Sequence, residues 1–172
     1  KYKDEPEKQK PYFNTITTLA KDIEKVIREL DPYRYTMIPN HGAFNSYVKA
    51  ELTDIPMIVG WNLYPGWYGK NIHSFENFLD NHQQKLDKPL IVTEYGADAD
   101  PRLRSFTPER FDSTLEYQVY YHIHYLREIL KRPFVAGANV WNLADFGSES
   151  RYDAMPFVNS KGLMTLDRKP KD

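Results

Sequence analysis

A glutamate stands where a strongly apolar stretch of the chain ends. The segment PLIVTEYGAD runs from Pro89 to Asp98, and its apolar part leads directly into Glu94 and Tyr95. A carboxylate at the end of a rigid, buried strand can be held still and aimed at a reacting carbon atom. Retaining glycosidases use two carboxyl groups about 5–5.5 Å apart, one as nucleophile and one as acid/base. Glu94 is therefore a candidate nucleophile. The alternative is a salt-bridged or solvated strand-end carboxylate without chemistry.

Aromatic and amide side chains follow two other apolar stretches. The segment GWNLYPGWYG places Tyr64 and Tyr68 just past a strand-like run, where their hydroxyls could face a polar site. The segment VWNLADFGS contains Trp141, a possible platform for the apolar face of a sugar ring. Asn142 beside it could bond sugar hydroxyls. The simpler alternatives are aromatic packing in a loop for the first segment and core packing for Trp141.

The elements that must position these residues follow an alternating pattern. Helical periodicity is expected from Asn14 to the Asp31–Pro32 stop, over 74–86, and from a capping box at Ser113 and Glu116 to about Lys131. Between these helices lie four short, nearly continuously apolar runs, at 35–40, 57–62, 90–95 and 135–141. Such runs are typical of parallel strands that are buried on both faces, which predicts the α/β class.

Each predicted strand ends in polar or aromatic residues. Asn40 and His41 follow the first strand, Asn62 and Tyr64 the second, Glu94 and Tyr95 the third, and Trp141 and Asn142 the fourth. The carboxyl ends of the strands form the active-site face of a β/α barrel, so Asn40 and His41 are also candidate substrate-binding residues. A full barrel takes about 250 residues and has eight strands. This chain supplies about four strands, so it is predicted to be half a barrel. No glycine-rich phosphate loop follows any strand, which disfavours a nucleotide-binding sheet.

Composition excludes several other classes of function. Lysine and arginine number 23 and aspartate and glutamate 24, so a net charge of −1 provides no field for nucleic acid or anionic lipid. No apolar run approaches the roughly 20 residues of a membrane helix. The chain has no cysteine, which rules out disulfides. The five histidines form no convincing ligand set, because His122 and His124 do not share a helix face. We therefore predict no metal and no cofactor.

Four segments in this order and spacing resemble glycoside hydrolase family 2: GWNLYPGWYG, PLIVTEYGAD, VWNLADF and NSKGLMTLDRKPKD. The resemblance extends from about residue 14 onward and implies strands five to eight of a catalytic TIM (β/α)8 barrel. Residues 1–13 are predicted to be a charged N-terminal loop and residues 14–172 the second half of the barrel. The resemblance implies a retaining mechanism without a cofactor.

The resemblance also implies roles for particular residues. The family nucleophile, the glutamate of its T-E-Y-G motif, matches Glu94, and the tyrosine that contacts it matches Tyr64. The family tryptophan at the sugar site matches Trp141. An Asn-x-Lys motif binds the substrate carboxylate in the β-glucuronidases, and Asn159 and Lys161 match its letters. Because shorter β-galactosidases resemble the whole pattern, we expect hydrolysis of terminal β-galactosides, with β-glucuronides as the alternative.

The family acid/base belongs to a strand that should precede this chain. Glu5 in the DEP segment echoes the family's N-E-P motif but has no strand to hold it, so it is interpreted as part of a charged loop. We therefore expect little turnover from this half alone. Expected partners are a carbohydrate substrate, the rest of the barrel and β-sandwich domains. Open sheet edges also allow a homo-oligomer.

Two further expectations come with the resemblance. Related short enzymes are often exported to a bacterial periplasm, which suggests a periplasmic or extracellular location. A function of another class also stays open: a non-catalytic module that binds sugar on Trp141 and on the loop from Tyr64 to Tyr68. Covalent labelling by a 2-fluoro sugar separates the two, because a binding module has no nucleophile to label.

Overall fold

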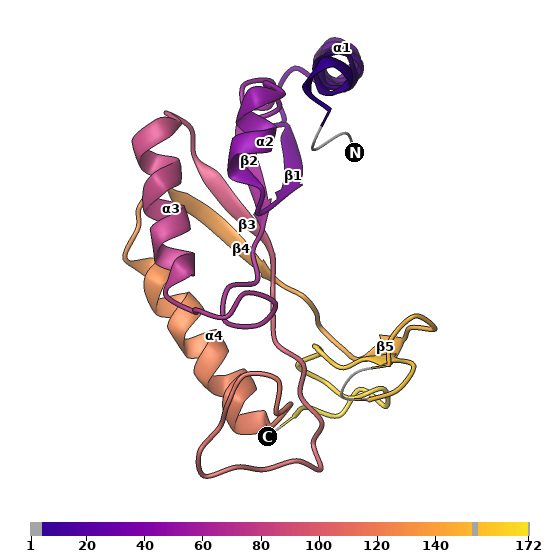
Figure 1. The fold of residues 1–172 in the computed structure, drawn as a ribbon, viewed down its shortest axis with the longest axis vertical. Helices are drawn as coiled ribbons and strands as arrows, with labels where there is room; N and C mark the ends of the chain where they lie inside the picture. Colours follow the sequence, from indigo (N-terminus) through magenta and orange to yellow (C-terminus); the bar gives the residue numbers. More distant parts are fainter. Residues whose placement is uncertain (1–4, 153–154, 172) are drawn as a thin grey trace.

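Four strands form one parallel sheet, in the order in which they occur along the chain. The computed structural model describes residues 5–152 and 155–171. The strands are β1 (Met37–His41), β2 (Ile58–Asn62), β3 (Leu90–Tyr95) and β4 (Val135–Val140). Consecutive β/α units of a barrel produce this strand order. The predicted α/β class and half barrel are therefore confirmed, with β1 and β4 at the edges of the sheet (Figure 1).

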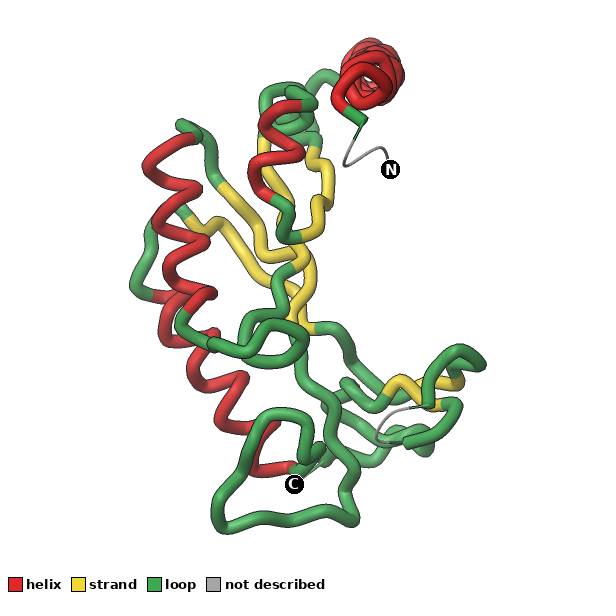
Figure 2. Tube along the Cα trace, in the orientation of Figure 1, coloured by secondary structure: helices red, strands yellow, loops and turns green. Residues whose placement is uncertain are grey.

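Aromatic side chains join the sheet to two helices on one of its sides. Helices α3 (Ser74–Lys85) and α4 (Leu115–Leu130) run along the same side of the strands (Figure 2). The ring of Phe75 in α3 stacks on Tyr125 of α4 with centroids 3.8 Å apart, and Tyr125 stacks on Tyr95 of β3 at 5.1 Å. Burying a large apolar side chain contributes about 1.5–3 kcal/mol. This layer therefore holds the end of β3 firmly in place.

Helix α1 (Pro6–Leu30) begins earlier than the predicted start at Asn14. The expected charged loop is therefore wrong from Pro6 onward, whereas residues 1–4 lie outside the described residues. Proline suits the first turn of a helix, where its missing N–H has no partner to lose. The glutamate, glutamine and lysine residues that follow are good helix formers. Charge alone therefore did not distinguish a solvated helix from a loop.

Helix α4 is capped one residue later than predicted. Thr114 is the N-cap, and its Oγ1 accepts a hydrogen bond from Tyr117 N at 3.2 Å. Ser113 has a φ of 55°, in the left-handed region, whereas an N-cap residue is usually extended. Glu116, expected to complete a capping box, instead accepts a hydrogen bond from Arg104 Nε at 2.6 Å. The capping-box prediction is therefore wrong, although the helix itself is confirmed.

Three very short elements were not predicted. They are helix α2 (Phe44–Lys49) and the antiparallel pair β5 (Phe146–Gly147) and β6 (Val158–Asn159). Each is too short to show a hydrophobic period, which requires a window of about 11–18 residues. Within the described ranges, no helix has both the length and the apolarity needed to cross a membrane.

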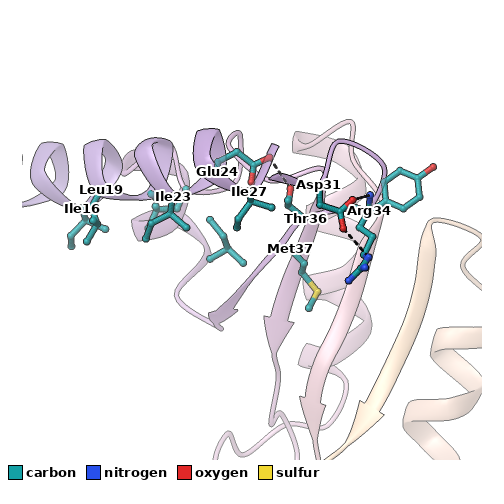
Figure 3. A pocket seen from close by; sticks show the side chains of 13 residues that line it. Ile16, Leu19, Ile23, Glu24, Ile27, Asp31, Arg34, Thr36 and Met37 are labelled. Atoms are coloured by element: carbon teal, nitrogen blue, oxygen red, sulfur yellow. Dashed lines mark hydrogen bonds and ion pairs between the residues drawn. The ribbon is translucent and has the colours of Figure 1, made fainter. Parts of the chain in front are cut away.

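The apolar face of α1 lines an open groove. Leu19 is 60% exposed and Ile23 is 50% exposed. Together with Ile27 and Met37 they line a groove of about 570 Å³ between the helix and β1 (Figure 3). The apolar period predicted for this helix is thus present. Its apolar face, however, is not covered by the described residues.

Candidate active site

The carboxyl end of β3 brings Glu94 and Tyr64 together. The Tyr64 hydroxyl donates a hydrogen bond to Glu94 Oε2 at 2.9 Å. Strand register makes this possible, because Asn62 at the end of β2 lies opposite Glu94, and Leu63 N donates to Glu94 O at 2.8 Å. Thr93 Oγ1 also donates to Asn62 Oδ1 at 2.6 Å. Glu94 is half-buried, and its backbone is held in the sheet while its carboxylate is bonded by Tyr64.

The surroundings of Tyr64 keep its phenol protonated. Burial, followed by the hydrogen bond to Glu94 and the charge of that carboxylate, raises the pKa of Tyr64 far above its usual value near 10. The hydroxyl therefore remains a donor throughout the neutral range. A neutral donor orients the Glu94 carboxylate without forming an ion pair with it.

Trp141 lies at the same edge of the sheet, at the end of β4. Its backbone N donates to Tyr95 O at 2.8 Å, and the side chain is 36% exposed. Gly96 permits this close approach, because a Cβ at that position would collide with the carbonyl oxygen of Trp141. The Trp141–Asn142 peptide bond is cis. The sequence prediction that Glu94 and Trp141 lie on one face agrees with this arrangement.

Asn40 and His41 both end β1 but have different surroundings. The side chain of Asn40 is fully buried, and its Nδ2 donates to Ile38 O and Gly60 O, each at 3.1 Å. The Asn40 amide therefore links β1 to β2, and it is covered from solvent in this arrangement. His41 is exposed, and its Nδ1 accepts from Ala43 N at 3.3 Å. The sugar-binding role of both residues stays a prediction.

A buried ionic cluster follows Glu94 on the same segment. Asp98, 1% exposed, forms an ion pair with the fully buried Lys161. Arg151 Nη1 donates to both Asp98 carboxylate oxygens, at 3.1 and 3.2 Å, and its Nη2 donates to the Tyr68 hydroxyl at 2.7 Å. Ser160 Oγ donates to Asp98 Oδ1 at 3.0 Å. Burial alone would raise the pKa of Asp98, but Lys161 and Arg151 together hold it below its ordinary value.

The cluster reaches Glu94 through two tyrosines. The rings of Tyr64 and Tyr68 lie 5.1 Å apart, and the Lys161 ammonium lies 4.9 Å from the centre of the Tyr68 ring. Tyr68 therefore contacts Tyr64, which bonds Glu94, and also Arg151 and Lys161. The sequence-predicted residues Tyr64, Tyr68, Glu94 and Lys161 are thus brought into one connected group.

Asn159 and Asn142 shape the loops around Lys161. Asn159 Oδ1 accepts a hydrogen bond from Lys161 N at 3.2 Å. Asn142 N donates to Lys161 O at 3.2 Å, and Leu163 N returns a bond to Asn142 O at 3.1 Å. The side-chain nitrogen of Asn142, Nδ2, is buried without a partner among the described residues. Contact of either asparagine with a sugar stays a prediction.

Sequence reasoning missed Asp98 and Arg151. Asp98 ends the PLIVTEYGAD segment that carries Glu94, so its position was available as a signal. No local pattern marks Arg151, which lies far along the chain in a segment without periodicity. Its position beside Asp98 and Tyr68 follows only from the way the long loops fold over the end of the sheet.

A comparison with models of protein families identifies the family of this chain. The model for glycosyl hydrolases family 2, TIM barrel domain, matches residues 11–172. The chain belongs to this family. The match includes all four strands of the sheet and both segments that meet at Glu94. The described sheet is therefore part of a family 2 TIM barrel, as the resemblance implied.

Similar proteins and structures are mostly named β-glucuronidases. A β-glucuronidase of Bacteroides fragilis is 33% identical over 157 residues, which cover 87% of this chain and 22% of that protein. The crystal structure of a Bacteroides uniformis β-glucuronidase is 44% identical, with a TM-score of 0.88, covering 94% of this chain and 19% of that one. A putative β-galactosidase from Bacteroides fragilis is 26% identical with a TM-score of 0.77, covering 91% and 24%.

These comparisons bear on the expected sugar. The chain spans about a fifth of the length of the first two relatives. Their names favour the β-glucuronidase alternative over the β-galactosidase that we expected from the sequence. The coarser prediction of a family 2 glycoside hydrolase domain is confirmed.

Proposed function

We propose that this chain supplies the nucleophile side of a retaining glycosidase that cleaves β-glucuronides. The observation that carries the proposal is the pairing of Glu94 with a tyrosine that stays neutral. The Tyr64 hydrogen bond goes to Glu94 Oε2. The other oxygen, Oε1, is then the one that attacks the anomeric carbon. The bond between that carbon and the aglycone oxygen breaks, and a glycosyl ester of Glu94 forms.

Both the formation and the hydrolysis of this ester need a second carboxyl group. In the retaining mechanism this group protonates the leaving oxygen and then takes a proton from the water that hydrolyses the ester. Glu5 is a poor candidate, because it is exposed at the N-cap of α1 and pairs with Lys8. We place the acid/base in the first half of the barrel, contributed by the remainder of the full-length protein together with its other domains.

Two observations support a glucuronide over a galactoside. A further similar structure, of Bacteroides uniformis β-glucuronidase 2 and 44% identical to this chain, is of that protein covalently bound to cyclophellitol-6-carboxylate aziridine. That ligand carries a carboxylate. In this chain two cationic side chains, Lys161 and Arg151, gather beside Tyr68 at the end of the sheet that holds Glu94. Cationic groups there suit a substrate with a carboxylate.

A β-galactoside is the second candidate, supported by the likeness to the putative β-galactosidase of Bacteroides fragilis. Lys161 is fully covered and paired with Asp98. If that pair is only structural, the cations do not select the sugar and a neutral substrate fits equally well. Assaying the two sugars side by side separates the candidates.

The test uses the full-length protein with aryl β-glucuronide and aryl β-galactoside, as wild type and as Glu94→Gln. We expect glucuronide turnover, and at least a ~10³-fold lower kcat in the variant, about 4 kcal/mol of transition-state stabilisation. A 2-fluoro glucuronide with a good leaving group should label Glu94 in the wild type alone. Cleavage of galactoside only would overturn the sugar, and unimpaired Glu94→Gln turnover would overturn the nucleophile. Absence of labelling and turnover would favour a carbohydrate-binding module.

A further inference from the structure

Two histidines and a glutamate meet on the outer layer of helices. His73 immediately precedes α3, Glu76 lies in the first turn of that helix, and His124 projects from α4. His73 Nδ1 lies 2.7 Å from Glu76 Oε1, and His124 Nε2 lies 3.0 Å from Glu76 Oε2. One ligand atom from each of the three residues can be chosen so that all lie within 4.8 Å of one another. No spacing in the sequence predicted this group.

The donor set has the chemistry of a transition-metal site. Two imidazole nitrogens and one carboxylate are the protein ligands of many zinc sites that keep a fourth position for water. Imidazole also favours zinc, copper and nickel over calcium and magnesium. The rings of His73 and His124 lie 5.1 Å apart at an interplanar angle of 80°. One nitrogen of each ring lies within 4.8 Å of the other and of a Glu76 carboxylate oxygen.

Burial makes the group more than a chance surface contact. The side chains of His124 and Glu76 are only 14% and 19% exposed, whereas His73 is 65% exposed. A metal could therefore enter from the His73 side, with two ligands already fixed by their helices. Phe75 is the sequence neighbour of Glu76, and Tyr125 is the sequence neighbour of His124. The rings of Phe75 and Tyr125 stack on each other. The backbone of both helices is thus held at this point before any metal binds.

We propose that His73, Glu76 and His124 bind one divalent transition-metal ion, with Zn²⁺ the best match. The ion clamps the start of α3 to α4 on the outside of the sheet (Figure 1). It also fixes the far end of the connection that begins just after β2 and carries Tyr64 and Tyr68. Without metal, the same three side chains remain linked by hydrogen bonds. The role proposed for the ion is to hold the two helices together, and no step of sugar cleavage passes through it.

The first experiment measures Zn²⁺ binding to the chelator-treated full-length protein by isothermal titration calorimetry. His124→Gln removes a ligand, and its amide can still donate a hydrogen bond to Glu76. His41→Gln is the matched control, because it deletes an exposed histidine outside the cluster. We expect the wild type and the control to bind one more Zn²⁺ than His124→Gln does, or to bind it at least about tenfold more tightly. Equal stoichiometry and affinity in all three proteins would overturn the site.

A second measurement keeps the proposal testable if His124→Gln folds poorly. Glu76→Gln keeps the shape of the side chain and removes the anionic ligand. Added Zn²⁺ should raise the Tm of the wild type and of His41→Gln, because an ion that binds only the folded state stabilises it. It should leave the Tm of Glu76→Gln and His124→Gln unchanged. A Zn²⁺-induced rise of the same size in both ligand variants would refute binding by this cluster.

Discussion

Glu94 near the end of β3 and Asp98 just after that strand are four residues apart, yet their surroundings are opposite. Glu94 is half-buried and accepts its hydrogen bond from a tyrosine that stays neutral. Asp98 is 1% exposed and is bonded by Lys161 and Arg151. A carboxylate whose negative charge is balanced by bound cations is a weak nucleophile. A carboxylate bonded only by a neutral donor is a stronger one toward an electrophilic carbon. The comparison therefore assigns the bond-breaking chemistry to Glu94, and to Asp98 the positioning of Lys161 and Arg151.

The largest expected effect is the loss of folding stability when Asp98 loses the cation Lys161. Lys161→Met leaves a buried carboxylate without its closest cation, and breaking a buried pair in this way costs roughly 3–5 kcal/mol. We expect that loss in the free energy of unfolding of the full-length protein, measured by denaturant titration. Glu94→Gln should leave the same quantity within about 1 kcal/mol of wild type.

An ion pair whose two partners are both exposed provides the control. Lys21 pairs with Glu51 at 2.9 Å, and their side chains are 57% and 60% exposed. Surface pairs contribute about 0–1 kcal/mol, so Lys21→Met should have little effect. If Lys161→Met is as mild as Lys21→Met, then Asp98 is not anchored by its cation and the contrast with Glu94 fails.

A smaller effect, on kcat, is expected when Glu94 loses its hydrogen bond from Tyr64. Tyr64→Phe removes the hydroxyl that orients the carboxylate while leaving the ring in place. We expect kcat to fall about 10–100-fold, equivalent to about 1.4–2.7 kcal/mol. Tyr120→Phe, on the exposed face of α4, is the control and should keep the wild-type kcat. An unchanged kcat in Tyr64→Phe would mean that the sheet alone positions Glu94.

The smallest effect concerns acid stability. The folded-state pKa of Asp98 is held below its ordinary value, because its cations outweigh the effect of burial. The stabilisation from ionised Asp98 is therefore complete above the unfolded-state pKa of about 3.9 and is lost as pH falls through the lower folded-state value. Asp98→Asn should flatten this acid-side loss in a series of unfolding titrations at decreasing pH. Parallel curves for wild type and variant would contradict the linkage.

Most of the sheet could be predicted because its information is local. The run from Leu90 to Tyr95 was predicted with the bounds it has in the structure, and the predicted strand at 135–141 ends one residue later than β4. Local signals were not sufficient where the same residues are compatible with two conformations. The charged segment after Glu5 fits a loop or a helix equally well, and both Ser113 and Thr114 are good caps. The backbone angle at Ser113 decided the second case.

The active site was predictable in its residues but not in its contacts. Glu94 and Tyr64 were both identified from their segments, because each follows an apolar run. The contrast between Glu94 and Asp98 could not be predicted, because the partners of Asp98, Lys161 and Arg151, come from loops remote in sequence. The same holds for His73 and His124, which lie on different helices.

The sequence by itself determined the order of the strands and the placement of Glu94 at the end of a rigid apolar stem. Periodicity and turn signals act between neighbours in the chain, and they are enough for that. Only the tertiary structure decided which carboxylate is neutralised and which is held by a neutral donor. Parallel strands bring distant segments to one edge of the sheet. The charge state and accessibility of a side chain depend on those distant neighbours.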